Sequence, residues 1–221
     1  MSIFELIAQT YPRLLDGLWI TVETTLISLV IAAILGLLFG LLSVSKATFL
    51  RGIARVYVDI IRGTPLIVQA FFIYFGITSA LGIRMEPITA GVITLSLNAG
   101  AYTAEIVRAG IQSINKGQME AARSLGLPYS MAMRKVILPQ AIKTMTPTIV
   151  NQCIITLKDS SILSVIGLAE LTQTGKLIIA NNLESFKMWL IIGVMYFIPI
   201  MILTKISAYI ERRMDYGKSR D

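Results

Sequence analysis

The chain has 221 residues, of which 55% are hydrophobic and 15% are charged, and its mean hydropathy is +0.72. Soluble domains average about 45–50% apolar and about 25% charged residues, so this composition indicates a membrane protein and excludes an intrinsically disordered chain. The chain has no histidine and a single cysteine, Cys153, which excludes a disulfide framework, a histidine-ligated metal site and a Ser–His or Cys–His nucleophile.

The first 16 residues form an N-terminal segment that we expect to lie at the membrane interface. The segment carries Glu5, Arg13 and Asp16 and has no basic stretch ahead of an apolar core. It therefore lacks the pattern of a cleaved signal peptide. The sequence predicts an amphipathic helix over 3–15, ahead of the membrane-embedded part of the chain, and assigns 1–16 to this segment.

Five segments are long and apolar enough for a helix to cross the hydrocarbon core, which takes about 20 mainly apolar residues. The fourth is unusual, because its uncharged run at 144–157 is short and a spanning helix must continue through Lys158 and Asp159. The sequence predicts an all-α integral membrane protein with a transmembrane domain at 17–212, a cytoplasmic tail at 213–221 and five transmembrane helices at about 20–44, 55–81, 87–112, 140–168 and 187–209.

The basic residues divide unevenly between the two sides that five spans define. Thirteen lie on the side of the C-terminus, and the other side has only Arg13, Arg84, Lys176 and Lys187. Because Lys and Arg collect in cytoplasmic loops, this distribution places the N-terminus outside and the C-terminus in the cytoplasm. The net charge of +7 then reflects loops near anionic membrane lipid, and no nucleic-acid partner is expected.

The connection between the third and fourth spans, 113–139, is long for so small a protein, and long ordered loops are usually functional. Within it, 118–125 is typical of a short helix, and Gly126 suits the left-handed position just after a helix. Pro128 suits the first turn of a second helix. The sequence therefore predicts a helix–turn–helix elbow on the cytoplasmic side.

This elbow resembles the EAA loop of ABC importer permeases, whose pattern is E-A-A, three residues, G, nine residues and then I-x-L-P. Six residues match this pattern with the correct spacing: Glu120, Ala121, Ala122, Gly126, Leu138 and Pro139. At the one remaining position, Val136 conservatively replaces isoleucine. Three further stretches are similar to the polar amino-acid branch of that family, at 62–66, 98–105 and 158–161, so that the resemblance covers about 15–212.

The resemblance implies the type I ABC importer permease fold in a bacterial cell membrane. Such a subunit pairs with a second permease subunit, identical or different, and receives a polar amino acid from an extracytoplasmic binding protein. Its EAA loop docks on a cytosolic ABC ATPase, where the small Ala121 and Ala122 permit close approach and Glu120 and Arg123 offer charges. The alternative for the elbow is an amphipathic loop helix that rests on the membrane.

No nucleotide-binding loop is found in the sequence. The nearest approach to G-x-x-x-x-G-K-[ST] ends at Gly175-Lys176-Leu177, with Glu170 where the first glycine is required. Leu177 also replaces the hydroxyl residue of that pattern. We therefore expect no cofactor in this chain and ATP bound by the partner ATPase.

Ionisable residues at membrane depth are costly, at roughly 2.5–3.5 kcal/mol each on insertion scales, and are therefore candidates for function. Lys158 and Asp159 are neighbours on a helix and do not face each other, so each needs another partner. With Ser160 and Ser161 they suggest that the fourth span breaks and restarts as a half-helix, whose N-terminus suits a substrate carboxylate. The alternative is that Lys158 and Asp159 pair with structural residues such as Glu105 or Arg62.

Two other groups of polar residues are substrate-binding candidates. Asn98, Tyr102 and Glu105 share one face of the third span and supply an amide, a phenol and a carboxylate, which suit a zwitterionic amino acid. The alternative role for them is hydrogen bonding between helices. Thr64 and Gln69 are secondary candidates, because Gly63-Thr64-Pro65 disrupts the second span and leaves backbone groups to be satisfied.

Two other classes of protein compete with an ABC permease. An ion-coupled secondary transporter usually shows inverted internal repeats, which we do not find, and that reading leaves the EAA elbow unexplained. An intramembrane enzyme needs a paired-acid or nucleophile constellation in the bilayer, and Lys158 and Asp159 are the only adjacent ionisable pair in a predicted span. We therefore expect a transport subunit without chemistry of its own.

Overall fold

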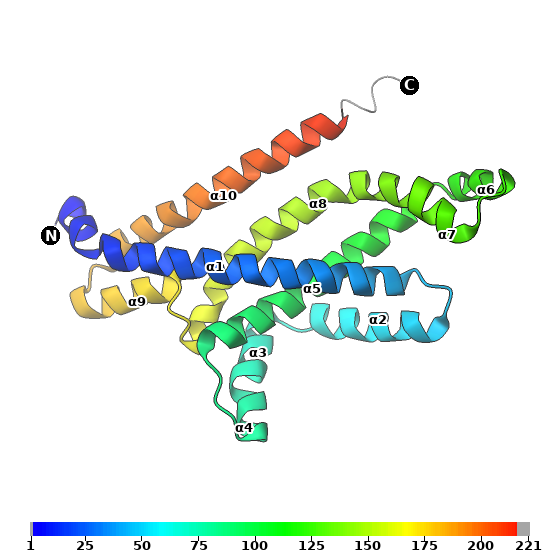
Figure 1. Ribbon diagram of the computed structural model, residues 1–221. Helices are drawn as coiled ribbons and strands as arrows, with labels where there is room; N and C mark the ends of the chain where they lie inside the picture. Colours follow the sequence, from blue (N-terminus) through cyan, green and yellow to red (C-terminus); the bar gives the residue numbers. More distant parts are fainter. Residues whose placement is uncertain (1, 216–221) are drawn as a thin grey trace.

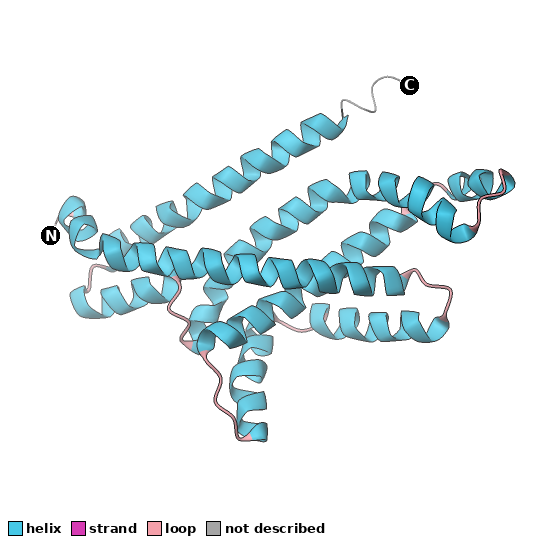
Figure 2. Cartoon of the chain, in the orientation of Figure 1, coloured by secondary structure: helices cyan, strands magenta, loops and turns pink. Residues whose placement is uncertain are grey.

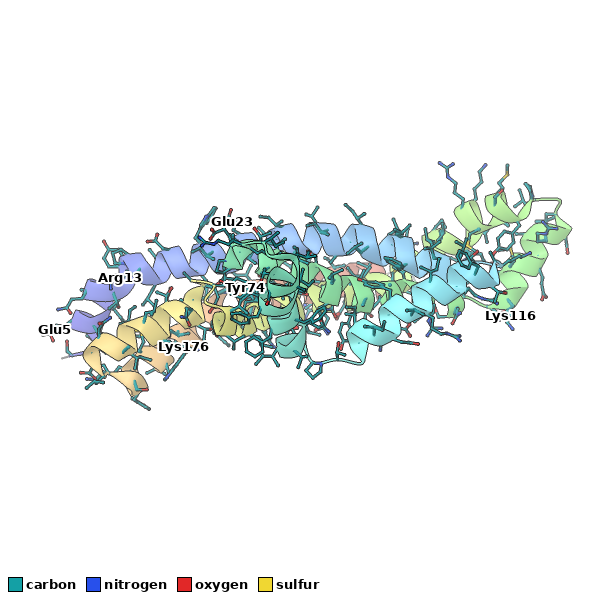
Figure 3. All side chains as sticks on the ribbon, turned by 90° about the horizontal axis from the view of Figure 1, so that it is seen from below. Glu5, Arg13, Glu23, Tyr74, Lys116 and Lys176 are labelled. Carbon is teal, nitrogen blue, oxygen red and sulfur yellow. The ribbon has the colours of Figure 1, made fainter. Side chains whose placement is uncertain are left out.

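The computed structural model describes residues 2–215, and over this range the chain is helical without any strand (Figure 2). Most helices run along one long direction, while the α3–α4 arm projects to one side (Figure 1). Charged residues lie toward both ends of this shape: Glu5, Arg13 and Lys176 at one end and Lys116 at the other (Figure 3). Of the tail predicted at 213–221, residues 216–221 lie outside the described range.

The first helix, α1 (Ile3–Ser43), begins with a capping box in which Ser2 and Glu5 each bond the other's backbone N–H. The helix continues through Pro12, and its first turns bend away from the rest (Figure 1). Residues 3–15, for which we predicted a helix of their own, are therefore the first turns of α1. There Leu6 and Leu14 belong to a buried cluster with apolar residues of α9 and α10.

The long helix α1 packs closely along α5 (Pro87–Gln112) because glycines of α1 face it. A Cβ on Gly36 would lie 2.4 Å from Cγ2 of Thr103, and one on Gly40 would lie 2.6 Å from Cβ of Val107. The two backbones can approach this closely only where no side chain intervenes. This glycine pair therefore serves the contact of α1 with α5 inside the chain.

The second span is divided by the turn that Gly63-Thr64-Pro65 forms. Helix α2 (Thr48–Arg62) ends there, and α3 (Leu66–Phe71), the π-helical turn η1 (Phe72–Ile77) and α4 (Thr78–Leu81) form a second arm, bent by 102° from the first. Proline lacks an N–H and disfavours helix at the preceding residue. The predicted disruption is confirmed, and the helix expected over 55–81 is two arms.

The elbow follows α5 as predicted. Helix α6 (Lys116–Ser124) ends before Gly126, whose φ of +83° is left-handed, and α7 (Tyr129–Ala132) starts after Pro128. The π-helical turn η2 (Met133–Ile137), α8 (Leu138–Asp159) and the 3₁₀ helix η3 (Ser160–Ile166) then continue as one helical run. The half-helix predicted to restart near Asp159 is therefore wrong, since α8 tightens into η3 without a free N-terminus.

The last helices, α9 (Leu171–Asn182) and α10 (Ser185–Asp215), are joined to each other through one buried carboxylate, and α9 also bonds α1. Glu170 caps α9 by accepting from the backbone N–H groups of Thr172 and Gln173, at 2.9 and 2.7 Å. The Tyr196 hydroxyl of α10 donates to the same carboxylate at 2.6 Å, and Leu171 N–H donates to Thr21 Oγ1 of α1 at 3.1 Å. Burial raises the pKa of the Glu170 carboxyl above its usual value.

Three helical runs in the described range are long and apolar enough to cross a membrane alone: Ile3–Ser43, Tyr129–Ile166 and Ser185–Arg212. The bent pair of α2 with α3–α4 makes a fourth if it counts as one span. Helix α5 does not reach this level of apolarity, because many of its residues are small or polar and are buried inside the protein. A helix enclosed by other helices does not need an apolar surface toward lipid.

Candidate functional site

A cavity of about 580 Å³ lies where the turn between α2 and α3 meets α5 and α8. Its lining combines an arginine, a carboxylate, two amides, a phenol and a threonine with a few apolar side chains. The lining residues are Arg62, Gly63, Thr64, Pro65, Leu66, Asn98, Tyr102, Gln152, Ile155 and Asp159. Four residues predicted from three separate stretches of sequence thus meet in one cavity: Thr64, Asn98, Tyr102 and Asp159.

Gln69, the other substrate-binding candidate near the turn, holds the turn together instead of lining the cavity. Its side-chain N–H₂ donates to the carbonyls of Ile61 and Thr64, at 2.7 and 3.0 Å, and is 2.9 Å from Thr64 Oγ1. Its carbonyl accepts from the Asn98 amide of α5 at 3.1 Å. Gln69 therefore satisfies backbone groups that the broken helix leaves free and fixes the orientation of Asn98.

Asp159 lies half-buried at the cavity wall, and no hydrogen bond or ion pair joins it to another side chain of the described range. Lys158 is exposed and lies outside the cavity lining. The hydroxyls of Ser160 and Ser161 donate to the carbonyls three residues earlier, both at 2.7 Å. These serines therefore close the end of α8, and the pairing of Lys158 or Asp159 with Glu105 or Arg62 is not formed.

Arg62 and Gln152 are lining residues that the sequence analysis did not select for the site. The Arg62 guanidinium lies 5.3 Å from the centroid of the Tyr102 ring, and its Nη1 is 3.7 Å from Glu105 Oε2. Arg62 could have been predicted as a lining residue, because it directly precedes the Gly63-Thr64-Pro65 turn. Gln152 gave no separate signal, since the same span also carries the amides Gln140 and Asn151 and nothing in the sequence distinguishes the three.

Glu105 points into a second cavity and not into the first. This cavity has a volume of about 500 Å³ and is lined by Ser43, Arg51, Arg55, Val58, Asp59, Arg62, Glu105, Arg108 and Gln112. Arg108 Nε donates to Glu105 Oε2 at 2.8 Å and a second guanidinium nitrogen bonds the other carboxylate oxygen. The predicted grouping of Glu105 with Asn98 and Tyr102 is therefore divided between two cavities, which share Arg62.

The elbow presents most of its predicted coupling residues to solvent. Glu120, Ala121 and Arg123 are exposed, Gly126 and Pro139 are exposed as well, Leu138 is half-buried, and Ala122 is buried. Leu125, which the sequence analysis did not select, is 84% exposed at the end of α6. The elbow is attached to the α1–α2 loop by Lys46, whose ammonium lies 4.7 Å from the Tyr129 ring centroid.

The sequence model of one protein family, described as "Binding-protein-dependent transport system inner membrane component", matches residues 21–216. The chain belongs to this family. The permease is therefore an inner-membrane transport component, in a family of transporter subunits and not of enzymes. Membership, together with a 40% identical solved structure of an ABC transporter, implies a substrate-binding protein and an ABC ATPase as partners.

Curated relatives and solved structures agree with this assignment. The permease is 40% identical over 210 residues to the arginine transport system permease protein ArtQ of Bacillus subtilis (strain 168), covering 95% of this chain and 94% of ArtQ. It is 41% identical over 204 residues to the glutamine transport system permease protein GlnP of Escherichia coli (strain K12), covering 92% of this chain and 93% of GlnP.

Two solved structures extend the comparison to the fold. A crystal structure of an amino acid ABC transporter with histidines matches at a TM-score of 0.91 and 40% identity, covering 96% of this chain and 99% of that one. An inward-facing conformation of the MetNI methionine ABC transporter matches at 0.79, with 21% identity and coverage of 93% and 98%, and shows the shared fold. The fold of the permease is that of type I ABC importer permeases.

Proposed function

We propose that this chain is the permease subunit of an ATP-driven importer for a polar amino acid, which passes through the 580 Å³ cavity. The observation that carries the proposal is the charge content of that cavity: Asp159, a half-buried carboxylate that forms no hydrogen bond or ion pair with another described side chain, and Arg62, a guanidinium from a different helix. A zwitterion needs one group of each sign. The relatives whose names specify arginine and glutamine, at 40% and 41% identity, support this substrate class.

The remaining lining residues suit the neutral parts of such a substrate. We assign hydrogen bonding to Thr64, Asn98, Tyr102 and Gln152, because amides and hydroxyls both donate and accept. Gln69 positions Asn98 through their shared hydrogen bond. Lys158, Ser160 and Ser161 stay outside the lining, and Glu105 acts in the second cavity. The chain needs no cofactor for these roles, and ATP is bound by the partner ATPase.

We assign contact with the ATPase to the elbow. Its exposed Glu120 and Arg123 offer charges, and Leu125 offers an apolar side chain that has no cover in the described chain. Gly126 sets the angle between α6 and α7 through its left-handed backbone. The remaining predicted contact residues, Ala121, Ala122, Leu138 and Pro139, form the surface and base of the same elbow.

The membrane arrangement that we propose has five spans, with the bent pair as one span and α5 enclosed among the others. The asymmetry of thirteen to four basic residues supports an outside N-terminus and a cytoplasmic C-terminus. A second permease subunit, identical or different, completes the translocation unit. Cysteine at Ser2 in a Cys153→Ser background should react with a membrane-impermeant label in intact cells, whereas cysteine at Arg220 should react only after permeabilisation. The reverse labelling overturns this orientation.

The transport function is tested in proteoliposomes that contain the permease, its ATPase and the binding protein. Uptake of labelled arginine or glutamine should require ATP and should persist when ion gradients are collapsed. Uptake driven by an ion gradient without ATP would instead identify a secondary transporter.

The role of the cavity is tested with Asp159→Asn, which keeps the shape of the side chain and removes its charge. It should lower uptake at least about tenfold, in line with the loss of one charge-assisted contact. The matched control is Asp16→Asn in the first turns of α1, which should leave uptake unchanged. Loss of Asp159→Asn protein from the membrane, with normal uptake per assembled complex, would assign Asp159 a structural role.

A further inference from the structure

Arg62 lines both of the cavities described above, and no other described residue lines both of them. It is the last residue of α2, directly before the sharp turn to α3. On one side it faces Tyr102 in the first cavity, and on the other it approaches Glu105 in the second. A solute that moves from one cavity to the other along α5 therefore meets Arg62.

Glu105 is held by its two arginines very unequally. Arg108 binds it with two guanidinium nitrogens, one at 2.8 Å, in the bidentate geometry that makes arginine–carboxylate pairs strong. Arg62 approaches the same carboxylate with one nitrogen at 3.7 Å, which is beyond hydrogen-bond distance. Glu105 therefore stays neutralised by Arg108 when Arg62 leaves, and releasing Arg62 costs little.

Arg62 also keeps most of its binding capacity free. A guanidinium has five N–H donors, and the contacts of Arg62 are the distant Glu105 oxygen and the face of the Tyr102 ring. Its side chain is 39% exposed. A carboxylate that enters the first cavity can therefore take up the two parallel hydrogen bonds that Arg62 does not form with Glu105.

The second cavity has the charge to receive an anionic group from Arg62. Four arginines line it, against two acidic residues, and Glu105 is already paired with Arg108. Arg55 forms no hydrogen bond or ion pair with another side chain in the described range, and it lines the second cavity but not the first. The lining of this cavity favours a carboxylate over an ammonium group.

We propose that Arg62 exchanges its carboxylate partner during transport: Glu105 in the absence of substrate, and the α-carboxylate of the amino acid once the first cavity is occupied. The exchange opens the way into the second cavity, where Arg55 receives the carboxylate before release. This inference rests on the proposed transport of an amino acid. It assigns Glu105 and Arg108 the role of holding Arg62 between the cavities without themselves binding substrate.

The exchange is tested by binding measurements on the permease–ATPase complex in lipid nanodiscs, without the binding protein. The probes are the transported amino acid, L-arginine or L-glutamine, and its α-amide, which keeps the ammonium group and lacks the carboxylate charge. The wild-type complex should bind the acid about tenfold more tightly than the amide, as expected for one charge-assisted contact. Arg62→Gln should reduce this ratio to about twofold or less, and Arg62→Lys should keep part of it.

Glu105→Gln should act in the opposite direction. By freeing Arg62, it should raise affinity for the acid by about threefold and leave affinity for the amide unchanged. The matched control is Arg84→Gln, outside both cavities, which should leave the ratio as in the wild type. Thermal unfolding of each complex separates loss of binding from loss of fold, and Arg62→Lys serves where Arg62→Gln does not assemble.

Two results overturn the exchange. One is an equal fall in affinity for the acid and the amide in Arg62→Gln, which assigns Arg62 a structural role. The other is a fall in affinity for the acid in Glu105→Gln.

The second cavity is tested separately by Arg55→Gln, which should keep the binding ratio and slow uptake about threefold. Unchanged uptake removes this cavity from the path. A wild-type complex that binds neither amino acid contradicts the proposed function itself, whereas binding without preference for the acid contradicts only this inference.

Discussion

The cavity and the elbow satisfy their polar groups in different ways. Around the cavity, Gln69 bonds the broken α2–α3 backbone and Asn98, so that amides and carbonyls are paired within the chain. In the elbow, Glu120 and Arg123 form no ion pair with other described residues and Leu125 is 84% exposed. The backbone around the cavity is thus organised by the chain itself, whereas the exposed groups of the elbow are left open to a partner protein, as we propose for the ATPase.

This difference predicts different consequences of mutation. A change near the cavity leaves buried polar groups or side chains without their partners, so it should affect folding and substrate binding together. A change in the elbow removes little from the isolated chain and should affect only assembly with the ATPase or its coupling. The following variants separate the two regions, from the largest expected effect to the smallest.

The scaffold beneath the cavity should be the most sensitive place. Gly36→Ala puts a Cβ only 2.4 Å from Thr103 Cγ2 and should push α1 from α5 at a cost of about 3 kcal/mol. Thermal unfolding of the purified permease measures this loss. The matched control is Gly52→Ala on α2, where nothing lies within 4 Å and the better helix former should stabilise by about 0.5–1 kcal/mol. Equal effects of the two variants contradict close α1–α5 packing.

The hydrogen-bonded turn should come next. Gln69→Leu leaves the Ile61 and Thr64 carbonyls and the Asn98 amide without their partner and should cost about 2 kcal/mol. Substrate affinity of the complex should fall while co-purification with the ATPase is retained. Gln118→Leu on the exposed face of α6 is the control for the change in side chain and should keep full affinity. Normal binding by Gln69→Leu shows that Asn98 does not need this support.

The elbow turn should respond in the complementary way. Gly126 has φ +83° and open space around it, so Gly126→Val is costly through backbone strain of about 1 kcal/mol and not through a clash. We expect poor co-purification with the ATPase and loss of its stimulation by loaded binding protein, with substrate affinity kept. Gly126→Asn, which tolerates the left-handed backbone, should be much milder. Full stimulation in Gly126→Val argues against the elbow as the coupling contact.

The smallest expected effect concerns how the elbow is attached. Lys46→Met removes the ammonium that lies 4.7 Å from the Tyr129 ring, a contact of about 0.5–1 kcal/mol at an exposed site. Loaded binding protein should then stimulate ATP hydrolysis less than it does in the wild type. Lys46→Arg and Tyr129→Phe preserve the cation–ring contact and should behave as the wild type. If stimulation falls as much in these two variants as in Lys46→Met, loss of the cation–ring contact does not explain the effect of Lys46→Met.

The features that the sequence predicted correctly depend on local signals. The left-handed Gly126 and the break at Gly63-Thr64-Pro65 each follow from the backbone preferences of one to three residues. Thr64, Asn98, Tyr102 and Asp159 were selected because polar groups are costly in a membrane and because of the family resemblance; they line one cavity, and their role in substrate binding stays a prediction.

The features that the sequence did not predict depend on distant contacts or on competing local bonds. Ser160 and Ser161 have the composition of a helix start, but their hydroxyls bond backward to carbonyls and the helix continues. The first turns of α1 have the pattern of a separate amphipathic helix. Their position depends on a buried cluster with Leu171 and Met188, which are distant in the sequence. Glu105 shares a helix face with Tyr102, yet its pair with Arg108 turns it to the other cavity.

The length of α1 has a mechanical consequence. A continuous helix of 41 residues measures about 60 Å, roughly twice the hydrocarbon thickness of a bilayer. In the N-terminal half of the helix Leu14 and Thr21 contact α9 and α10, and after its C-terminal end the loop that follows Ser43 carries Lys46 to the elbow. Helix α1 is thus long enough to extend beyond the hydrocarbon core on both sides of the membrane. We expect a displacement of α9, by a protein bound at the proposed outer face, to be transmitted along α1 to Tyr129 without passing through the cavity.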